Sequence, residues 1–171
     1  VDTEAGDQEH FPCPHCGQPV PEMSMSNFSF NKPAGACPTC TGLGTIYQAN
    51  IDRLVDRDKS IRAGAVSGWD IHYLGRYEVT FAAAGRYYGF QLDMDQPVKE
   101  FGPIQRDFLL YGVRSPQFRR HVGDKEPPAS VSTGFFEGIV TNLLRRHAEH
   151  AADSDYLEKI EQLLFLQTCP D

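Results

Sequence analysis

The stretch GACPTCTGLG, residues 35–44, places two cysteines three positions apart among glycine, proline and threonine. A second pair with the same spacing, Cys13 and Cys16, precedes it by 20 residues. Two residues between cysteines let both thiolates face one metal ion while the backbone turns, and two such pairs supply the sulfurs of a tetrahedral zinc site. Gly17 and Gly42 follow the two pairs, where such a turn needs positive φ. We therefore predict one zinc ion bound by Cys13, Cys16, Cys37 and Cys40.

A redox role fits the cysteines less well than a metal site. A redox couple needs a single such pair on a βαβ scaffold, whereas two pairs lie here on a segment rich in proline and glycine. Four sulfurs leave zinc no open position for water, so the predicted site is structural and no catalytic residue is expected. His15 lies between the first two cysteines and could bind the metal, but it is expected to be exposed or to lie behind the sulfurs, which already complete the set. Cys169 begins what looks like a third pair and has no local partner in the sequence.

The bulk composition limits the class of protein. The 171 residues include 23 acidic and 16 basic side chains, giving a net charge of -7, which argues against DNA binding by the whole surface. No run approaches the roughly 20 apolar residues of a membrane helix, and no leader pattern is visible, so a cytoplasmic protein without membrane partners is expected. We interpret both ends as cut sites in a longer protein.

The chain is expected to have an α+β fold with two main parts. A cysteine-rich segment with little regular structure has too few apolar residues to fold without a metal staple. A mixed helical domain carrying a β-hairpin follows it. The predicted parts are a flexible stretch at 1–12, a zinc module at 13–45, an insertion-type domain at 46–168 and a truncated knuckle at 169–171.

Helices are indicated by spacing and end signals at three places in the second part. Aromatic residues recur at helical spacing over 73–90, and Gly89 is a natural stop. Pro103 and Gly112 suit the two ends of another helix. From Thr141 to about residue 166 the pattern is helical again, interrupted near Asp153, which can cap the last helix. The stretches 113–122 and 130–140 are predicted to be the two strands of a hairpin.

Basic residues are concentrated in one region. Residues 106–147 hold seven basic and four acidic side chains, whereas residues 1–45 hold one basic and five acidic side chains. Arginines there could meet phosphates, which fixes position without reading sequence. They could equally be solvated, and Arg145 and Arg146 could pair with Glu149 along a helix. The candidate DNA-binding residues are Arg114, Arg119, Arg120, Lys125, Arg145 and Arg146. The aromatics near 73–88 are expected to be core rather than a base-stacking platform.

Several motifs carry a family resemblance. CPHCG at 13–17, FSFN at 28–31, GACPTCTGLG at 35–44 and FFEGIVTNLLRRH at 135–147 resemble the first zinc module and insertion domain of UvrA, the damage-recognition ATPase of bacterial excision repair. The sequence departs from the commoner pattern at MSMSNFS, at His147 and over 46–130. Both a main repair UvrA and a divergent paralogue, including the drug-resistance type, are compatible with it.

The resemblance implies a non-catalytic, damage-sensing fragment of a larger ABC-type ATPase. The intact family binds damaged double-stranded DNA, pairs with a second UvrA copy and loads UvrB. No G-x-x-x-x-G-K-[ST] loop occurs in the sequence, so ATP is expected to bind only to parts of the parent absent here. Two alternatives stay open: a DnaJ-like chaperone zinc module, suggested by CPTCTGLG, and a protein-interaction module of a UvrA-like paralogue.

Overall fold

The computed structural model describes residues 10–12, 14–21, 36–37, 39–132 and 136–170. The chain divides into two compact units, and we call residues 1–46 with 166–171 the cysteine unit and residues 47–165 the helical unit. The boundaries predicted from the sequence, 13–45 and 46–168, stay a prediction. None of the helices in these described ranges has the length and apolar character that crossing a membrane requires.

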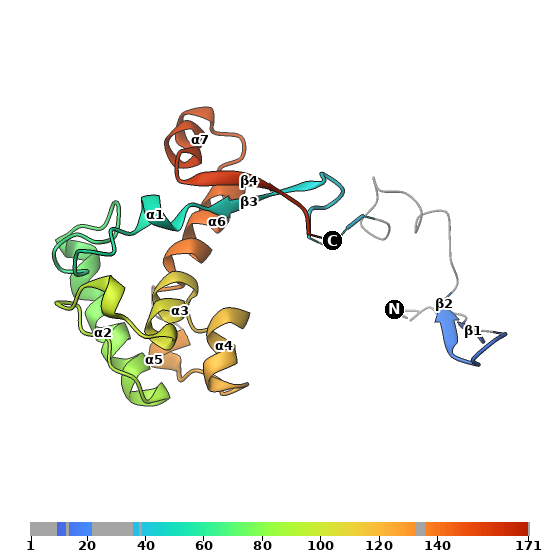
Figure 1. Ribbon diagram of the computed structural model, residues 1–171, viewed down its shortest axis with the longest axis horizontal. Coiled ribbons are helices and arrows are strands. Elements are labelled where there is room, and N and C mark those ends of the chain that lie inside the picture. The colour runs from blue at the N-terminus through green and yellow to red at the C-terminus, as the bar shows by residue number, and fades with distance from the viewer. Residues whose placement is uncertain (1–9, 13, 22–35, 38, 133–135, 171) are drawn as a thin grey trace, which may run out of the picture. The chain divides into compact units, whose positions relative to one another are not determined.

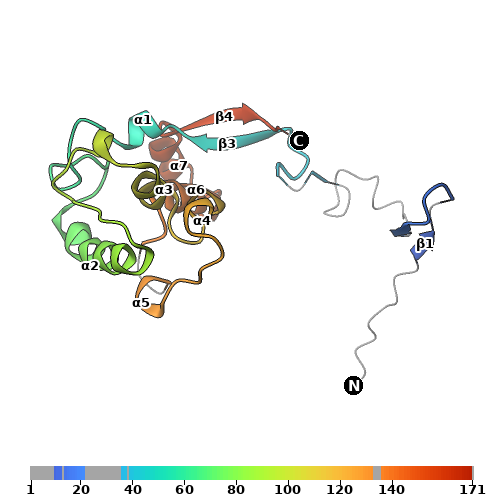
Figure 2. The same cartoon turned by 60° about the horizontal axis from the view of Figure 1, so that its bottom comes forward.

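The described part of the chain contains two small sheets. Strand β1 (His10–Pro12) pairs antiparallel with β2 (Pro19–Pro21). Strand β3 (Thr45–Ala49) pairs with β4 (Leu164–Thr168), and both strands lie side by side in Figures 1 and 2. The pair is antiparallel, because the residue after β3, Asn50, donates its N–H to the carbonyl of the residue before β4, Leu163, at 2.8 Å. The mixed α+β class predicted from the sequence is thereby confirmed.

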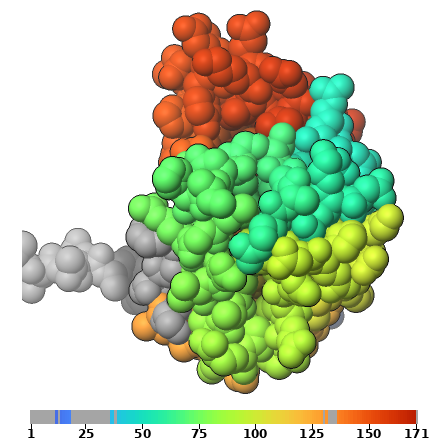
Figure 3. Space-filling view, turned by 90° about the vertical axis from the view of Figure 1, so that its left-hand side faces the viewer, coloured from blue at the N-terminus to red at the C-terminus, as the bar shows by residue number. Residues whose placement is uncertain are grey.

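Helices make up most of the helical unit. They are α1 (Ile51–Leu54), α2 (Ile71–Tyr88), the 3-10 helix η2 (Val98–Glu100), α3 (Pro103–Tyr111), α4 (Pro116–Val122), α5 (Ala129–Ser132), α6 (Ile139–Glu149) and α7 (Ser154–Glu161). Helix α3 packs against α4 and α6, α2 against α5, and α6 against α7. Figure 3 shows one face of this unit, where α2 and the segment before it are green.

Local signals set the ends of the long helices, and all of those named here except the Asp70 cap were predicted. The Asp70 carboxylate accepts the N–H groups of His72 and Tyr73 at the start of α2, and Gly89 ends that helix at φ 81°. Pro103 opens α3 and Gly112 ends it. Asp153 caps α7 by accepting the N–H of Tyr156. These three helix predictions are confirmed.

The core of the helical unit is built around aromatic rings. Phe81, Phe108 and Phe118 are each no more than 2% exposed and come from α2, α3 and α4. Phe136 packs edge-on against Phe81, with ring centroids 4.7 Å apart. Edge-to-face contacts of this kind add to the stability that burial supplies. The core therefore ties the helices together without a metal in this unit.

The predicted hairpin over 113–140 is wrong. The described residues of this stretch form α4, α5 and the start of α6, and contain no strand. Ser115 accepts the N–H of Phe118 and Pro116 follows it, which is a helix start signal. The burial pattern also fits a helix, because Phe118 is buried while Arg120, two positions on, is exposed. In a strand, residues two apart would lie on the same face.

The helical pattern expected to about residue 166 also ends early. Helix α7 stops at Glu161, and Leu164–Thr168 is strand β4. The apolar run there can continue a helix or form a strand. This run forms a strand because it pairs with β3, which is more than a hundred residues away in the sequence.

Candidate functional site

The second cysteine pair forms a tight turn in the cysteine unit. The N–H of Thr41 donates to the Cys37 carbonyl at 2.8 Å, and the N–H of Gly44 points to the Cys40 Sγ at 3.3 Å. Gly42 has φ 88°, and Gly17, after the first pair, has φ 72°. The predicted positive φ after each pair is confirmed. The N–H of Gly44 is the main cause that lowers the pKa of the Cys40 thiol to about 7, which favours the thiolate that a metal needs.

Three sulfurs converge at this turn. The Sγ atoms of Cys37, Cys40 and Cys169 all lie within 4.8 Å of one another. Sulfurs that share one tetrahedral zinc at Zn–S distances of about 2.3 Å lie about 3.8 Å apart. The Sγ atoms of Cys37 and Cys169 are 3.6 Å apart, close to that value. The donor set therefore fits zinc or a similar thiophilic metal ion.

The four predicted ligands differ in where they lie. Cys37 and Cys40 are brought together, as expected for half of a site. Cys16 is exposed and outside the cluster of described sulfurs, and Cys13 lies outside the described residues. Cys169, which the sequence left without a local partner, joins instead, because its N–H donates to the Gly44 carbonyl at 2.9 Å. Only the apolar run before Cys169 could have hinted at a strand that brings it there.

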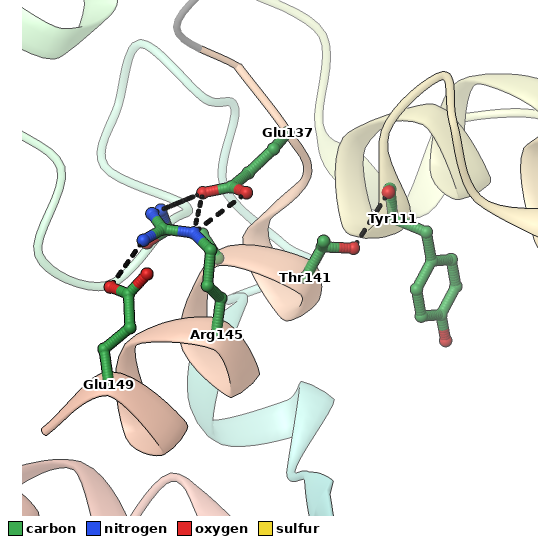
Figure 4. A network of polar contacts seen from close by, with 6 residues as sticks. Tyr111, Glu137, Thr141, Arg145 and Glu149 are labelled. Carbon is green, nitrogen blue, oxygen red and sulfur yellow. Dashed lines mark hydrogen bonds and ion pairs between the residues drawn. The ribbon is translucent and has the colours of Figure 1, made fainter. Parts of the chain in front are cut away.

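Three of the six candidate DNA-binding cations are held by other groups of the protein. Arg145 is bound between two carboxylates, with Glu137 at 2.7 Å and Glu149 at 2.6 Å (Figure 4). These contacts raise the pKa of Arg145, Glu137 contributing most, and the Arg145 guanidinium holds the pKa of Glu137 below its ordinary value. Lys125 donates to the carbonyl of Tyr87 at 3.0 Å and lies over that ring.

Arg119 is the third such cation, at 3.3 Å from Glu126 in the same region. A phosphate would have to compete with these bound carboxylates and carbonyls. Such residues are therefore less able to contribute to DNA binding than their charge suggests.

The other three cations are more available. Arg120 has 71% of its side chain exposed, donates its Nε–H to the Gln117 carbonyl at 3.4 Å and approaches Asp107 to 3.9 Å. His121 contacts the same Asp107 carboxylate at 2.7 Å. Arg114 and Arg146 are exposed, and their guanidiniums make no hydrogen bond or ion pair to the residues that the structure describes. An exposed guanidinium without a carboxylate partner keeps its donors for an oxyanion. Arg114, Arg120 and Arg146 are thus the better candidates for phosphate contact.

The helical unit has its own apolar core, and the cysteine unit brings three sulfurs together. Residues 51–162 match the family described as the UvrA DNA-binding domain. Because this match covers more than half of the 171 residues, the chain belongs to that family.

Curated relatives agree with this assignment. The UvrABC system protein A of Streptococcus pyogenes serotype M1 is 37% identical over 166 residues, which cover 94% of this chain and 17% of the relative. That of Pseudomonas aeruginosa PAO1 is 36% identical over 162 residues, with 94% and 17% covered. The chain thus spans about a sixth of the length of these relatives. The predicted UvrA resemblance is confirmed.

A solved structure gives the same result for the fold alone. The crystal structure of UvrA2 from Deinococcus radiodurans has a TM-score of 0.54 and 23% sequence identity to this chain. The similarity covers 95% of this chain and 20% of the UvrA2 chain.

Proposed function

We propose that this chain is a non-catalytic, DNA-contacting segment of a UvrA-type excision repair ATPase. The observation that carries the proposal is the match of residues 51–162, nearly the whole helical unit, to the UvrA DNA-binding domain. The exposed guanidiniums of Arg114, Arg120 and Arg146 supply donors for phosphates, and such contacts position a duplex without reading its sequence. A sensor of damage needs this, since damage has no fixed sequence and is recognised by distortion.

The cysteine unit would hold a structural zinc ion in this function. Cys37, Cys40 and Cys169 would supply three thiolates, and the predicted pair Cys13 and Cys16 remains the source proposed for a fourth. A closed set of protein sulfurs leaves no position for water, so zinc would stabilise the fold and take no part in chemistry. In the parent protein this segment would act with a second UvrA copy and with UvrB.

A salt titration tests the DNA proposal. Binding of a fluorescent duplex to the 171-residue chain is expected with a Kd of roughly 10⁻⁴ to 10⁻⁶ M at physiological salt, as for non-specific contacts. Changing Arg114 and Arg120 together to alanine should reduce the slope of log K against log salt by roughly one for each phosphate that is no longer bound. Damaged and undamaged duplexes should be affected equally if both residues only position the backbone.

Arg57→Ala is the matched control. Arg57 is an exposed arginine in an ion pair with Asp52, outside the region rich in basic residues. Its removal should leave the slope unchanged. An unchanged slope in the double variant would remove Arg114 and Arg120 from the interface, and a loss limited to damaged DNA would show that they sense the lesion. Calorimetry should detect no ATP binding, because the sequence has no phosphate-binding loop.

A further inference from the structure

Four aromatic residues form a ladder that runs from the core to the surface. Trp69, Tyr73, Tyr77 and Phe81 are spaced four residues apart, so they follow one face of α2 and the turn before it. The Tyr77 ring lies 4.7 Å from Trp69, 6.1 Å from Tyr73 and 5.9 Å from Phe81, measured between centroids. Phe81 is 2% exposed and Tyr73 is 41% exposed. The outer end of the ladder therefore offers aromatic surface beyond what the core uses.

This outer end lines a pocket of about 300 Å³. Trp69, Tyr73 and Tyr77 line it together with Asn142 and Arg146 of α6 and Tyr156 of α7. In Figure 3 the green segment around the start of α2 adjoins the orange-red part of the chain that contains α7. The volume is at the lower end of the range for small-molecule sites, which suits one planar ring system.

Two charged side chains line the pocket, Arg146 and Glu137. The Glu137 carboxylate is bound by Arg145, whereas the Arg146 guanidinium makes no hydrogen bond or ion pair to the described residues. Burial raises the pKa of Tyr77; Tyr73 and Glu137 add to that rise, and the positive charge of Arg146 opposes it. A guanidinium in this position can stack on a ring or donate to a phosphate.

We propose that this pocket binds a single nucleobase unstacked from a duplex, which stacks on Trp69 and Tyr73 while Arg146 contacts the adjoining phosphate. The proposal rests on the DNA-binding function proposed above. Every base has an aromatic face, so a stacking site works without sequence preference. Extruding a base costs least where damage or mispairing has already weakened its stacking. The pocket would therefore favour damaged sites with a chemistry that phosphate contacts alone do not supply.

Trp69 is the single tryptophan of the chain, so its fluorescence reports on the pocket. The probes are a duplex with one unpaired thymine and a fully paired duplex of otherwise equal sequence, each carrying a dye for anisotropy. We expect the unpaired thymine to quench Trp69 and to raise affinity over the paired duplex. Tyr73→Leu should lower affinity for the first duplex by roughly 5- to 100-fold, the range for loss of one stacked base, and leave the second unchanged.

Two further variants make the test specific. Tyr87→Leu removes a tyrosine from the other end of α2, outside the pocket, and should leave the preference for the unpaired base intact. Arg146→Gln should reduce that preference without altering the core, since Arg146 is exposed. Far-UV circular dichroism and thermal melting establish that each variant is folded.

The outcomes separate this proposal from the one on which it rests. Equal affinity of the wild-type chain for both duplexes would overturn the base pocket and leave DNA binding in place. An equal loss for both duplexes in Tyr73→Leu would also overturn the pocket, because Tyr73 would then serve general binding. Absence of binding to either duplex would overturn the proposed function itself.

Discussion

The Sγ atoms of Cys37 and Cys169 lie 3.6 Å apart although 132 residues separate them in the chain. The backbone supports this approach, since Cys169 donates its N–H to the Gly44 carbonyl just after the second cysteine pair. A metal ion bound there would link the two ends of the chain that flank the helical unit. A zinc ion bound by this cluster would therefore close the fold as well as hold a single loop.

Cys169→Ser is expected to lower zinc affinity about as much as Cys37→Ser, because each variant removes one thiolate from the cluster. The loss should be roughly tenfold or more, since metal binding is coupled to folding. Competition with a colorimetric zinc indicator measures the affinity. Cys16→Ser is the comparison: Cys16 is exposed, lies outside the cluster and is one of two proposed sources of the fourth thiolate, so its loss should cost less than that of Cys169. If Cys16→Ser released zinc and Cys169→Ser did not, the ligand set predicted from the sequence would hold and Cys169 would not be a ligand.

Zinc removal should unfold only the cysteine unit. Zinc binding to small cysteine motifs is worth ~10–16 kcal/mol and is coupled to their folding. The helical unit has its own aromatic core and needs no metal to bury it. After chelation, hydrogen exchange should become fast for described residues 36–37 and 39–46 and stay slow for α2, α3 and α6. A parallel loss of helical signal would show that the two units fold together.

Glu137→Gln should destabilise the helical unit by about 1 kcal/mol at pH 7, a modest amount because the ion pair is partly exposed. The Arg145 guanidinium contributes most to holding the pKa of Glu137 below its ordinary value of 4.5, and the hydrogen bond from Asn142 adds to this effect. A lowered pKa in the folded state contributes stability above pH 4.5 that is lost as the pH falls through the folded value. Urea unfolding should therefore show a difference between wild type and variant at pH 7 that shrinks towards pH 3.

Glu158→Gln serves as the control for that experiment. Glu158 is exposed on α7 and makes no ion pair to the described residues, so its loss should change neither the stability at pH 7 nor its pH dependence. A difference for Glu137→Gln that persisted unchanged in acid would show that packing, and not charge, causes the destabilisation.

Gly138→Ala should destabilise the protein by about 2–4 kcal/mol, since overpacking and left-handed backbone each cost energy. Gly138 has φ 95°, and a Cβ there would meet the backbone of Tyr111 and Gly112, where α3 packs against the start of α6. Gly64→Ala is the matched control, because Gly64 also has positive φ but open space around it. It should cost only about 1–2 kcal/mol. Equal midpoints in urea would mean that the helices can separate to admit the methyl group.

The helices with clear end signals could be predicted from the sequence, because caps act over a few residues. Asp70 and Gly89 bound α2, and Asp153 starts α7, without help from distant parts of the chain. The prediction of a hairpin failed at Ser115 and Pro116, where a start signal for a short helix was taken for part of a strand. Strand β4 was missed because its partner, β3, is far away in sequence.

The candidate sites show the same division between local and distant information. The turn at Cys37 and Cys40 is local, so the sequence predicted it, whereas the approach of Cys169 depends on strand pairing. From their charge alone, Arg145 and Arg146 are equal candidates for contact with DNA. Only the fold shows that Glu137 and Glu149 bind the first and not the second.

The hydrogen bond between Asn50 and Leu163 brings together the two points at which the chain enters and leaves the helical segment. A domain whose ends meet can be cut out or exchanged as a cassette, because the remaining ends need only a short bridge. The helical unit could thus be transplanted between homologous parents without lengthening or twisting the host chain.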